Sequence, residues 1–255
     1  MILIIEIDVM EKDNKYINFL KRNFIIKIFF NLFDQFNNLI PSQNTKTRIM
    51  SSLVLLPISI IAIFYSEDLF FLLALTISII MTMEWINITA KAKNQKKWRI
   101  IGFFYILVPI FCMVKIRFIE PYILLWMFVI IWSTDIFAFF AGRAIGGPKL
   151  AINISPNKTW SGLLGGVIAS SFVGLISSII FPGSVLFFVV VSSILSLVEQ
   201  ISDLIESKIK RIFSVKDSGS IIPGHGGLID RLDGVILVAP LVFCLILIFP
   251  QNFFN

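Results

Sequence analysis

The chain has 255 residues and a net charge of +6, and 57% of its residues are hydrophobic while only 15% are charged. A soluble domain carries charge on roughly a quarter of its residues, so the composition excludes an ordinary soluble protein. In a soluble protein the positive charge would suit nucleic acid. In a membrane protein the enrichment of Lys and Arg in cytoplasmic loops accounts for it, and we predict no nucleic-acid partner.

The first part of the chain, residues 1–45, differs in composition from the rest. Its stretch "NKYINFLKRNFIIKIFFNLFDQFNNLI" mixes apolar residues with lysine, arginine and aspartate. Such a mixture is typical of an amphipathic helix at the membrane interface or of a loosely attached extension, and a true span is the less favoured alternative. We therefore predict an N-terminal extension over residues 1–45 and a transmembrane domain over residues 46–255.

Apolar runs fill the rest of the chain, and they are long enough to cross a hydrocarbon core of about 30 Å as helices. They do not alternate as β-barrel strands do, so we predict an all-α, polytopic transmembrane helical bundle of about seven spans (about six to nine). The spans are predicted near residues 49–66, 69–90, 100–114, 121–142, 162–182, 184–202 and 234–250. Basic residues precede the first span and follow the second, which predicts a cytoplasmic N-terminus.

Three polar segments interrupt the apolar runs, and the first is "WSTDIFAFFAGRAIGGPKL" at residues 132–150. On a helix, Asp135, Phe139 and Arg143 lie on one face. An ion pair between Asp135 and Arg143 and a functional role for Asp135 are both open, because an acid in a membrane span is a functional candidate by default. Small residues at the same spacing allow another helix to approach closely: Ala138, Gly142 and Gly146.

The second segment is "ISPNKTWSG" at residues 154–162. Ser155-Pro156-Asn157 is interpreted as a turn, and Thr159 or Ser161 is a candidate cap for the helix that follows. With Lys158 nearby, the free N–H groups of this helix N-terminus favour an anion. Most capped helices bind nothing, so this observation alone is a weak indication of a site.

The third segment begins with "SLVEQISDLIESKIKRIF", in which Glu199, Asp203 and Glu206 form one acidic stripe on a helix. Lys210 continues the stripe, so partial neutralisation by salt bridges is the simplest interpretation. The segment continues as "KDSGSIIPGHGGLIDRLDG", residues 216–234, which contains the only histidine of the chain. We call residues 216–234 the glycine segment.

The glycine segment combines glycines with aspartates that begin the last span. Gly224, Gly226 and Gly227 surround His225 and allow backbone N–H groups to converge on an anion. One histidine excludes a zinc site built from several histidines. Mg²⁺ is commonly held by carboxylates and substrate phosphates. The candidate carboxylate ligands are Asp203 on one helix and Asp230 and Asp233 on the next.

Neighbouring basic side chains would bind the phosphates, Arg as a bidentate fork and Lys as a point charge. Neither of the common phosphate-binding glycine motifs of soluble nucleotide enzymes, GxxxxGK[ST] or GxGxxG, occurs in the chain. From these residues we predict a membrane enzyme that handles a polyphosphate with Mg²⁺ at the cytoplasmic surface.

Residues 207–233 resemble the signature of the CDP-diacylglycerol synthases, also called phosphatidate cytidylyltransferases. Every fixed position of that signature is present: Ser207, Lys210, Arg211, Lys216, Asp217, Pro223, His225, Gly226, Gly227, Asp230, Arg231 and Asp233. The two other polar segments resemble the family's Asp-Thr-Gly-Ala-Tyr-Phe-x-Gly-Arg and Ser-Pro-x-Lys-Thr-x-Glu-Gly stretches. Three positions depart from the family pattern, with Phe139 for Tyr, Ser161 for Glu and Ser202 for Gly.

The resemblance covers residues from about 48 to 250 and implies the reaction of CTP with phosphatidate to give CDP-diacylglycerol and pyrophosphate, with Mg²⁺. It implies a polytopic helical fold that is often dimeric, a bilayer environment, and a site open to the cytoplasm in a bacterial-type inner membrane. Family members hold the metal on the residues that match Asp203, Asp230 and Asp233. Whether a second, monovalent cation accompanies the Mg²⁺ is left open by the sequence.

Candidate roles follow from the resemblance and the residue chemistry together. The predicted catalytic residues are Asp203, Asp230, Asp233, Lys216 and Arg231. The predicted substrate-binding residues are Lys158, Ser155, Asp135, Ser207, Lys210, Arg211, Asp217, Gly224, His225, Gly226 and Gly227. Lys158 is the candidate for the lipid phosphate, and His225 either donates to a phosphate or fixes the backbone around it.

Two other functions are weighed against this one. A CTP-dependent kinase of a polyprenol or phytol would release CDP rather than pyrophosphate. An ion-coupled transporter would use intramembrane acids such as Glu84 and Asp135 as a relay, and it predicts charges at mid-span and repeated halves. The charges of this chain instead gather at one predicted face and no repeat is visible, so the cytidylyltransferase is favoured.

Overall fold

The computed structural model describes residues 57–219 and 226–254. The predicted extension over residues 1–45 and the beginning of the first predicted span lie outside the described residues, as do Gly224 and His225. The later part of that span, residues 57–65, is helical.

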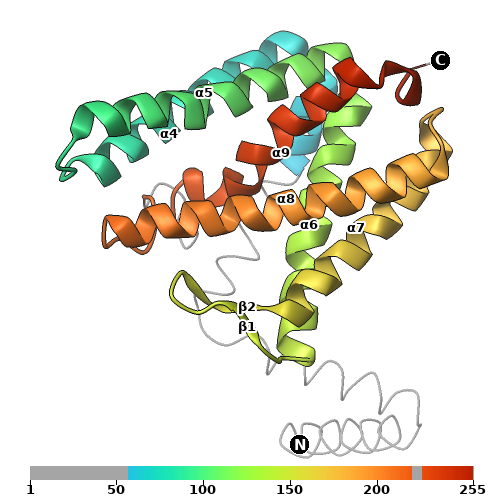
Figure 1. The fold of residues 1–255 in the computed structure, drawn as a ribbon. Helices are drawn as coiled ribbons and strands as arrows, with labels where there is room; N and C mark the ends of the chain where they lie inside the picture. The colour runs from blue at the N-terminus through green and yellow to red at the C-terminus, as the bar shows by residue number, and fades with distance from the viewer. Residues whose placement is uncertain (1–56, 220–225, 255) are drawn as a thin grey trace, which may run out of the picture. The chain divides into compact units, whose positions relative to one another are not determined.

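Six long helices, a short hairpin and a C-terminal 3₁₀ turn make up the rest of the described chain (Figure 1). The helices are α4 (Glu67–Thr89), α5 (Gln95–Ile119), α6 (Pro121–Ala144), α7 (Trp160–Ile180), α8 (Val185–Ile212) and α9 (Ile229–Ile248). The remaining elements are β1 (Lys149–Ala151), β2 (Ser155–Thr159) and η1 (Pro250–Asn252). All six helices are long and apolar enough to cross a membrane. The prediction of a polytopic helical membrane protein is thereby confirmed.

Two helices exceed their predicted spans by the most. α5 has 25 residues rather than a short span over 100–114, and α8 has 28 residues and ends at Ile212 rather than near residue 202. α8 therefore carries the whole acidic stripe on one uninterrupted helix. Polar "WSTD" does not split α6, because the hydroxyl of Thr134 donates to the carbonyl of Ile130 at 2.8 Å and lies 2.7 Å from the hydroxyl of Ser170 on α7. Each hydroxyl is thus satisfied inside the helix pair.

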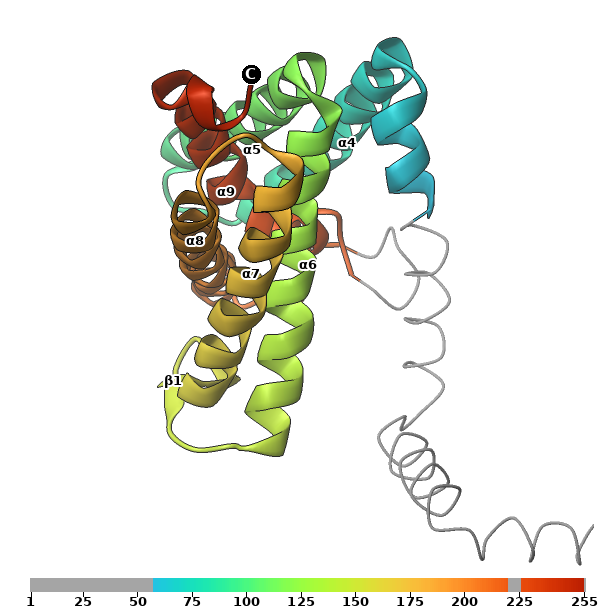
Figure 2. The same cartoon turned by 90° about the vertical axis from the view of Figure 1, so that its right-hand side faces the viewer.

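α6, α7 and α8 pack side by side in chain order, and α8 continues the arrangement onto α9 (Figures 1 and 2). The crossing of α6 and α7 depends on glycine, since a Cβ on Gly162 would lie 2.8 Å from the carbonyl oxygen of Ala138 and 3.5 Å from the Cα of Gly142. The predicted stripe of small residues therefore does bring a second helix close, through Ala138 and Gly142. Gly146 lies beyond the end of α6, at φ 68°.

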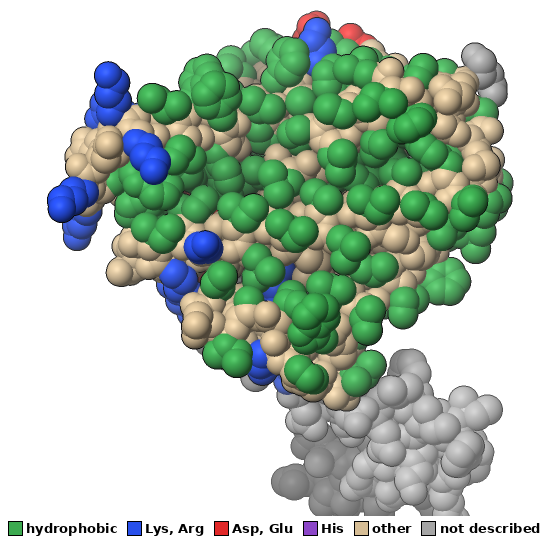
Figure 3. All heavy atoms as spheres, viewed as in Figure 1, with side chains coloured by type: hydrophobic (Ala, Val, Ile, Leu, Met, Phe, Trp, Pro, Cys, Tyr) green, Lys and Arg blue, Asp and Glu red, His purple; other side chains and the backbone are tan. Residues whose placement is uncertain are grey.

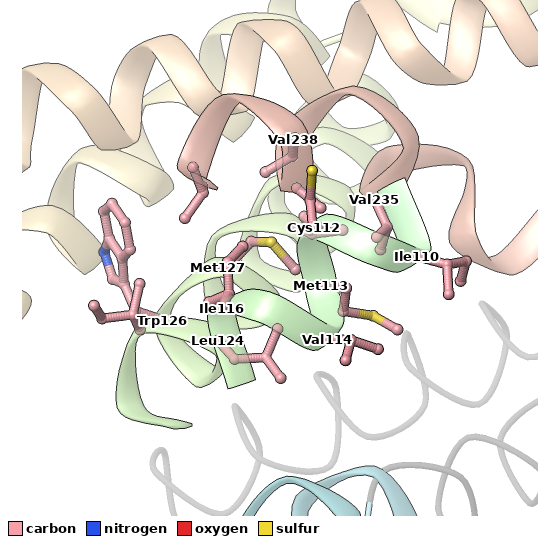
Figure 4. Packing of buried hydrophobic residues seen from close by; sticks show 14 of the residues in the cluster. Ile110, Cys112, Met113, Val114, Ile116, Leu124, Trp126, Met127, Val235 and Val238 are labelled. Carbon is pink, nitrogen blue, oxygen red and sulfur yellow. The ribbon is translucent and has the colours of Figure 1, made fainter. Parts of the chain in front are cut away.

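The hydrophobic core lies where α4, α5, α6 and α9 meet. Figure 4 shows side chains of α5, α6 and α9 pointing toward one another, among them Ile116, Met127 and Val238, which are fully buried. Because lipid is as apolar as these side chains, close packing rather than removal from water stabilises their association. The core thus fixes α5, α6 and α9 as a rigid base on which the polar residues of α8 and α9 are placed.

Outside the core, the helices present hydrophobic side chains to their surroundings. Figure 3 shows one face on which green hydrophobic side chains spread over the helices, while Lys and Arg lie mainly at the left and lower edges, with a few charged side chains at the top. This distribution fits helices that lie in a bilayer with their charged ends in water.

The segment between α6 and α7 is an antiparallel hairpin rather than the predicted turn at Ser155-Pro156-Asn157. These residues belong to β2, and Ala151 pairs with Ser155 while Lys149 pairs with Thr159. The turn is made by the residues just before, where the N–H of Ile154 donates to the carbonyl of Ala151 at 3.1 Å. The predicted turn is present in this region, but it lies a few residues earlier than predicted. The proline-containing stretch is not the turn because it pairs with β1 as a strand.

Candidate active site

An acidic cluster lies between α8 and α9. Asp203 and Glu206 come from α8 and Asp233 comes from the second turn of α9, and each offers a carboxylate oxygen within 4.8 Å of the others. Glu206 is 2% exposed. The cluster forms because Asp203 and Glu206, three residues apart, share one helix face, and α9 packs along that face.

Two lysines flank the acidic cluster. Lys158 of β2 reaches Asp203, with 2.5 Å between Nζ and Oδ2, and it donates to the amide oxygen of Gln200 at 3.1 Å. Lys210, one turn after Glu206 on α8, lies 2.8 Å from its Oε2. The predicted neutralisation of the acidic stripe is therefore found, and Lys158 contributes to it from outside the helix.

Asp230 lies beside the cluster and has partners on both oxygens. Its Oδ1 accepts from Lys210 Nζ at 2.7 Å. Its Oδ2 accepts from the backbone N–H of Ser218 and of Gly227, both at 2.8 Å, and from the Ser218 hydroxyl at 3.0 Å. Asp230 therefore joins the described residues on either side of 220–225, in addition to any role as a metal ligand, which stays a prediction.

Asp233 is fixed by its own backbone and by α8. Its Oδ1 accepts from the N–H of Gly234 at 2.8 Å, and its carbonyl accepts from the hydroxyl of Ser202. A Cβ on Gly234 would lie 3.0 Å from Cγ of Glu199, so the close contact of α8 and α9 favours glycine there. Ser202, one of the departures from the family pattern, thus holds the two acid-bearing helices together.

A cavity of about 520 Å³ adjoins the cluster on the side of Lys158. It lies between α6, the hairpin, α7 and α8, and its lining is Asp135, Ala138, Phe139, Gly142, Arg143, Lys149, Asn157, Lys158, Thr159, Gly162, Leu163 and Gln200. The predicted face of Asp135, Phe139 and Arg143 is therefore a wall of this cavity. Among the described residues no ion pair joins Asp135 to Arg143, whose guanidinium carbon lies 5.9 Å from the ring centre of Phe139.

The beginning of α7 orders the hairpin against α6. Thr159 caps the helix by accepting from the N–H of Gly162 at 3.1 Å, as predicted. Ser161 stands where the family usually has Glu, and its hydroxyl donates to the carbonyl of Gly146 and lies 3.0 Å from the hydroxyl of Thr159. A serine at this position thus connects α6 to the hairpin that carries Lys158.

Of the remaining predicted residues, two form hydrogen bonds near the acidic cluster and the hairpin, and the others lie outside the cavity lining or on the surface. The Ser207 hydroxyl donates to Oδ1 of Asp203 at 3.3 Å, and Nε of Arg211 donates to the carbonyl of Ile154 in the hairpin turn at 3.4 Å. Ser155 is half-buried at the start of β2, outside the cavity lining. Three residues are exposed at the ends of α8 and α9 and of their connection: Lys216, Asp217 and Arg231.

One described glycine of the glycine segment has a backbone that other residues rarely adopt. Gly226 has φ 79°, a left-handed conformation that favours glycine, and Gly227 is buried with its N–H directed at Asp230.

Sequence reasoning did not assign a site role to two acids. Glu206 was recognised only as part of the stripe, although its spacing from Asp203 could have identified it as a further candidate ligand. Glu84 of α4 was considered only as part of a transport relay, yet it accepts hydrogen bonds from Ser218 and from the start of α9. Its position inside an apolar span was the available signal, but the partners lie far along the chain.

The donor set of the acidic cluster fits a hard divalent cation. Three carboxylates converge, and Oε1 of Glu206 is buried without a hydrogen-bond partner among the described residues. Such an oxygen is costly in an apolar interior unless a positive ligand compensates it. Oxygen ligands from two helices are the kind of set that Mg²⁺ accepts, with substrate phosphates completing it.

Comparison with known proteins identifies the family of the chain. A model of the cytidylyltransferase family matches residues 98–249, which contain the hairpin, α8, α9 and most of α5. The phosphatidate cytidylyltransferase of Rickettsia felis is 39% identical over 211 residues, which cover 79% of this chain and 92% of that protein. The same-named protein of Rickettsia bellii is 38% identical over 211 residues, covering 79% and 90%. That of Brucella abortus is 41% identical over 182 residues, covering 69% and 67%.

The family match, over residues 98–249, includes the acidic cluster, both flanking lysines and the cavity wall of α6. The resemblance found in the sequence is confirmed, and the chain belongs to the cytidylyltransferase family and is a nucleotidyltransferase.

Proposed function

We propose that this enzyme transfers CMP from CTP to phosphatidate, giving CDP-diacylglycerol and pyrophosphate for phospholipid biosynthesis, at the cytoplasmic face of a bacterial inner membrane. The observation that carries the proposal is the acidic cluster of α8 and α9, which is flanked by two lysines, one of which, Lys158, also lines the cavity between α6, α7 and the hairpin. The phosphatidate cytidylyltransferases that resemble this chain support the choice of both substrates.

Asp203, Glu206 and Asp233 would hold Mg²⁺, with Asp230 beside them as the further predicted ligand. The ion, when bound, supplies positive charge that stabilises the nucleotide phosphates and the departing pyrophosphate. The protein adds its own cations, because Lys210 lies between Glu206 and Asp230, where it would face phosphates bound on the cluster. Lys216 and Arg231 are the proposed exposed contacts for the same phosphates.

The cavity is the proposed position of the phosphatidate headgroup. Arg143, Lys149 and Lys158 give its lining three positive side chains, while Phe139 and Leu163 give it an apolar wall. A lipid phosphate with attached acyl chains needs this combination of positive and apolar surface. Lys158, which contacts both the cavity and Asp203, would bring the two substrates together.

The reaction requires positioning more than proton transfer. A phosphatidate oxygen, already anionic, forms a bond to the α-phosphorus of CTP, and the bond between that phosphorus and the oxygen that bridges to the β-phosphate breaks. Pyrophosphate carries the electron pair away, so no strong base is needed. Lysine and arginine side chains that hold both phosphates in line would supply most of the protein's contribution, through orientation and charge stabilisation.

The distribution of basic residues supports a cytoplasmic site and a cytoplasmic N-terminus. Trp98 at the start of α5 packs against Phe213 at the end of α8, with ring centres 4.8 Å apart, so the connection of α4 to α5 shares an end of the bundle with the last turns of α8. That connection and its neighbourhood carry exposed basic residues: Lys91, Lys93, Lys96, Lys97 and Arg99. Such a concentration favours the cytoplasmic side.

The test is product formation by purified protein in detergent with CTP, phosphatidate and Mg²⁺, with and without EDTA. The proposal expects CDP-diacylglycerol and pyrophosphate in equal amounts, and neither when EDTA is present. Release of CDP with phosphorylation of a prenol, and no product from phosphatidate, would favour the lipid-kinase alternative. Absence of CTP turnover with any lipid would contradict the proposal. The mass of the active species in the same detergent tests whether the enzyme is a homodimer, as members of the family often are.

A further inference from the structure

Glu84 lies in the apolar helix α4, yet its carboxylate is fully engaged. The side chain is 3% exposed. Oε1 accepts from the N–H of Leu228 at 2.9 Å, and Oε2 accepts from the N–H of Ile229 at 3.0 Å and from the hydroxyl of Ser218 at 3.1 Å. An acid inside a membrane span is expensive unless its oxygens are satisfied, and here three donors satisfy them.

These bonds replace the missing cap of α9. Leu228 occupies the N-cap position and supplies no side-chain hydrogen bond of its own. The first N–H groups of a helix have no partner within the helix, and they carry partial positive charge from the helix dipole. Glu84 therefore caps α9 from a different helix, and its carboxyl oxygens lie where the helix dipole favours negative charge.

The carboxylate needs glycine on both sides of residues 220–225. A Cβ on Gly219 would lie 2.7 Å from Oε1 of Glu84, and a Cβ on Gly227 would lie 2.5 Å from either oxygen. Any other residue at these positions would displace the acid. Two glycines of the glycine segment are therefore needed to make room for one acid of α4. The sequence interpretation explained the glycines of this segment only by phosphate binding.

Ser218 links Glu84 to Asp230. The single hydroxyl proton of Ser218 lies within reach of Oε2 of Glu84 at 3.1 Å and of Oδ2 of Asp230 at 3.0 Å. Asp230 also accepts from the N–H of Ser218 and of Gly227. Glu84 and Asp230 thus share one donor, the Ser218 hydroxyl, and together hold the described residues on either side of 220–225. Asp233 follows on the next turn of α9.

We infer that Glu84 is a positioning residue for the cytidylyl-transfer site. It fixes the first turn of α9, so that Asp230 and Asp233 keep their places opposite α8, and it does this without touching either substrate. The inference rests on the proposed function for its kinetic consequences, while the hydrogen bonds that it describes are independent of the reaction.

The test compares Glu84→Gln with Asp68→Asn, an exposed acid in the first turn of the same helix. Glutamine keeps the shape of the side chain but places an N–H₂ group against an N–H donor of α9. We expect kcat to fall by about 10- to 100-fold with little change in KM for phosphatidate, since small displacements of reacting groups cost about that much. The Mg²⁺ concentration for half-maximal activity should rise, and Glu84→Asp should recover part of the loss.

Hydrogen–deuterium exchange gives a readout that does not need turnover. Peptides that contain residues 217–232 should exchange faster in Glu84→Gln than in wild type, and Asp68→Asn should change neither exchange nor kinetics. If the wild type does not turn over CTP, the proposed function fails, while the exchange result still tests the cap. Unchanged exchange and kinetics in Glu84→Gln would overturn the inference.

Two further outcomes also test whether Glu84 is a positioning residue. Faster exchange with unchanged kcat and Mg²⁺ requirement would show that Glu84 supports only local structure, and would overturn its role in positioning. If Glu84→Gln does not fold, Gly219→Ala serves instead, because its Cβ displaces the carboxylate while the acid is kept. That variant should show the same fall in kcat, and wild-type kinetics in it would contradict the inference.

Discussion

Lys158 of β2 and Asp203 of α8 form an ion pair with 2.5 Å between Nζ and Oδ2, and both side chains are mostly buried. The pair connects the hairpin to the acidic cluster and places one cation at the boundary between that cluster and the cavity. Removing either partner would leave the other charge without compensation in an apolar protein.

Lys158→Met should lower kcat/KM by about 100-fold or more, because it removes charge stabilisation at the point where both substrates would meet. Lys208→Met is the matched control, since Lys208 is an exposed lysine of α8. Activity measured over a range of phosphatidate concentrations checks the prediction, and equal kinetics in the two variants would contradict it.

Asp203→Asn and Asp233→Asn should each abolish turnover while leaving a folded, membrane-inserted protein, because each removes a charged ligand from the proposed metal site. Glu206→Gln should raise the Mg²⁺ concentration needed for half-maximal activity. Mg²⁺ titrations of activity, with folding checked by size-exclusion chromatography, distinguish these cases. An unchanged Mg²⁺ requirement in Glu206→Gln would exclude Glu206 from the site.

Asp230→Asn should cost stability as well as turnover. Its Oδ2 accepts three hydrogen bonds, and Lys210 would lose one of its two acidic partners. Leaving buried donors unpaired costs about 1–3 kcal/mol each, so the thermal unfolding temperature should fall. Thermal unfolding in detergent measures this loss, and an unfolding temperature equal to that of wild type would show that the described bonds contribute little.

Gly162→Ala should destabilise the protein by about 1–3 kcal/mol, because its methyl group would press on the backbone of α6 at the crossing. Leu164→Ala, two residues along the same helix and on an exposed face, is the control. The prediction is a lower unfolding temperature for Gly162→Ala than for Leu164→Ala. The reverse order would show that α6 and α7 separate at little cost.

Ser202→Gly, which restores the residue typical of the family, removes the hydroxyl that donates to the carbonyl of Asp233. A net loss of about 0.5–1.5 kcal/mol is expected for one hydrogen bond, with a small fall in kcat as Asp233 loosens. Measuring the unfolding temperature and kcat of Ser202→Gly checks both parts of this prediction. A gain in stability would mean that the serine is tolerated rather than used.

Local patterns in the sequence predicted the parts of this structure that depend on neighbours along the chain. Apolar runs identified the helices, and the helical spacing of Asp203 and Glu206 placed both on one face. The small residues Ala138 and Gly142 correctly indicated a close helix crossing. Polar residues within a span were a weaker guide, because hydroxyls such as that of Thr134 are satisfied by helix carbonyls and by the next helix.

Contacts between distant segments could not be predicted in this way. The bond from Leu228 to Glu84 joins residues 144 positions apart, and no spacing rule connects them. Asp230 was predicted only as a ligand, since the sequence does not reveal that two backbone N–H groups point at it. The hairpin was missed because β1 and β2 have too few residues for an alternating pattern to be recognised.

The uninterrupted length of α8 has a consequence for where catalysis can occur. Its 28 residues extend for about 42 Å along the axis, whereas the hydrocarbon core of a bilayer is about 30 Å thick. Asp203 lies 18 residues after Val185, the first residue of α8, or about 27 Å along the helix. The depth of the carboxylates relative to the lipid headgroups is therefore set by helix length, and thicker membranes would draw the site away from the aqueous nucleotide.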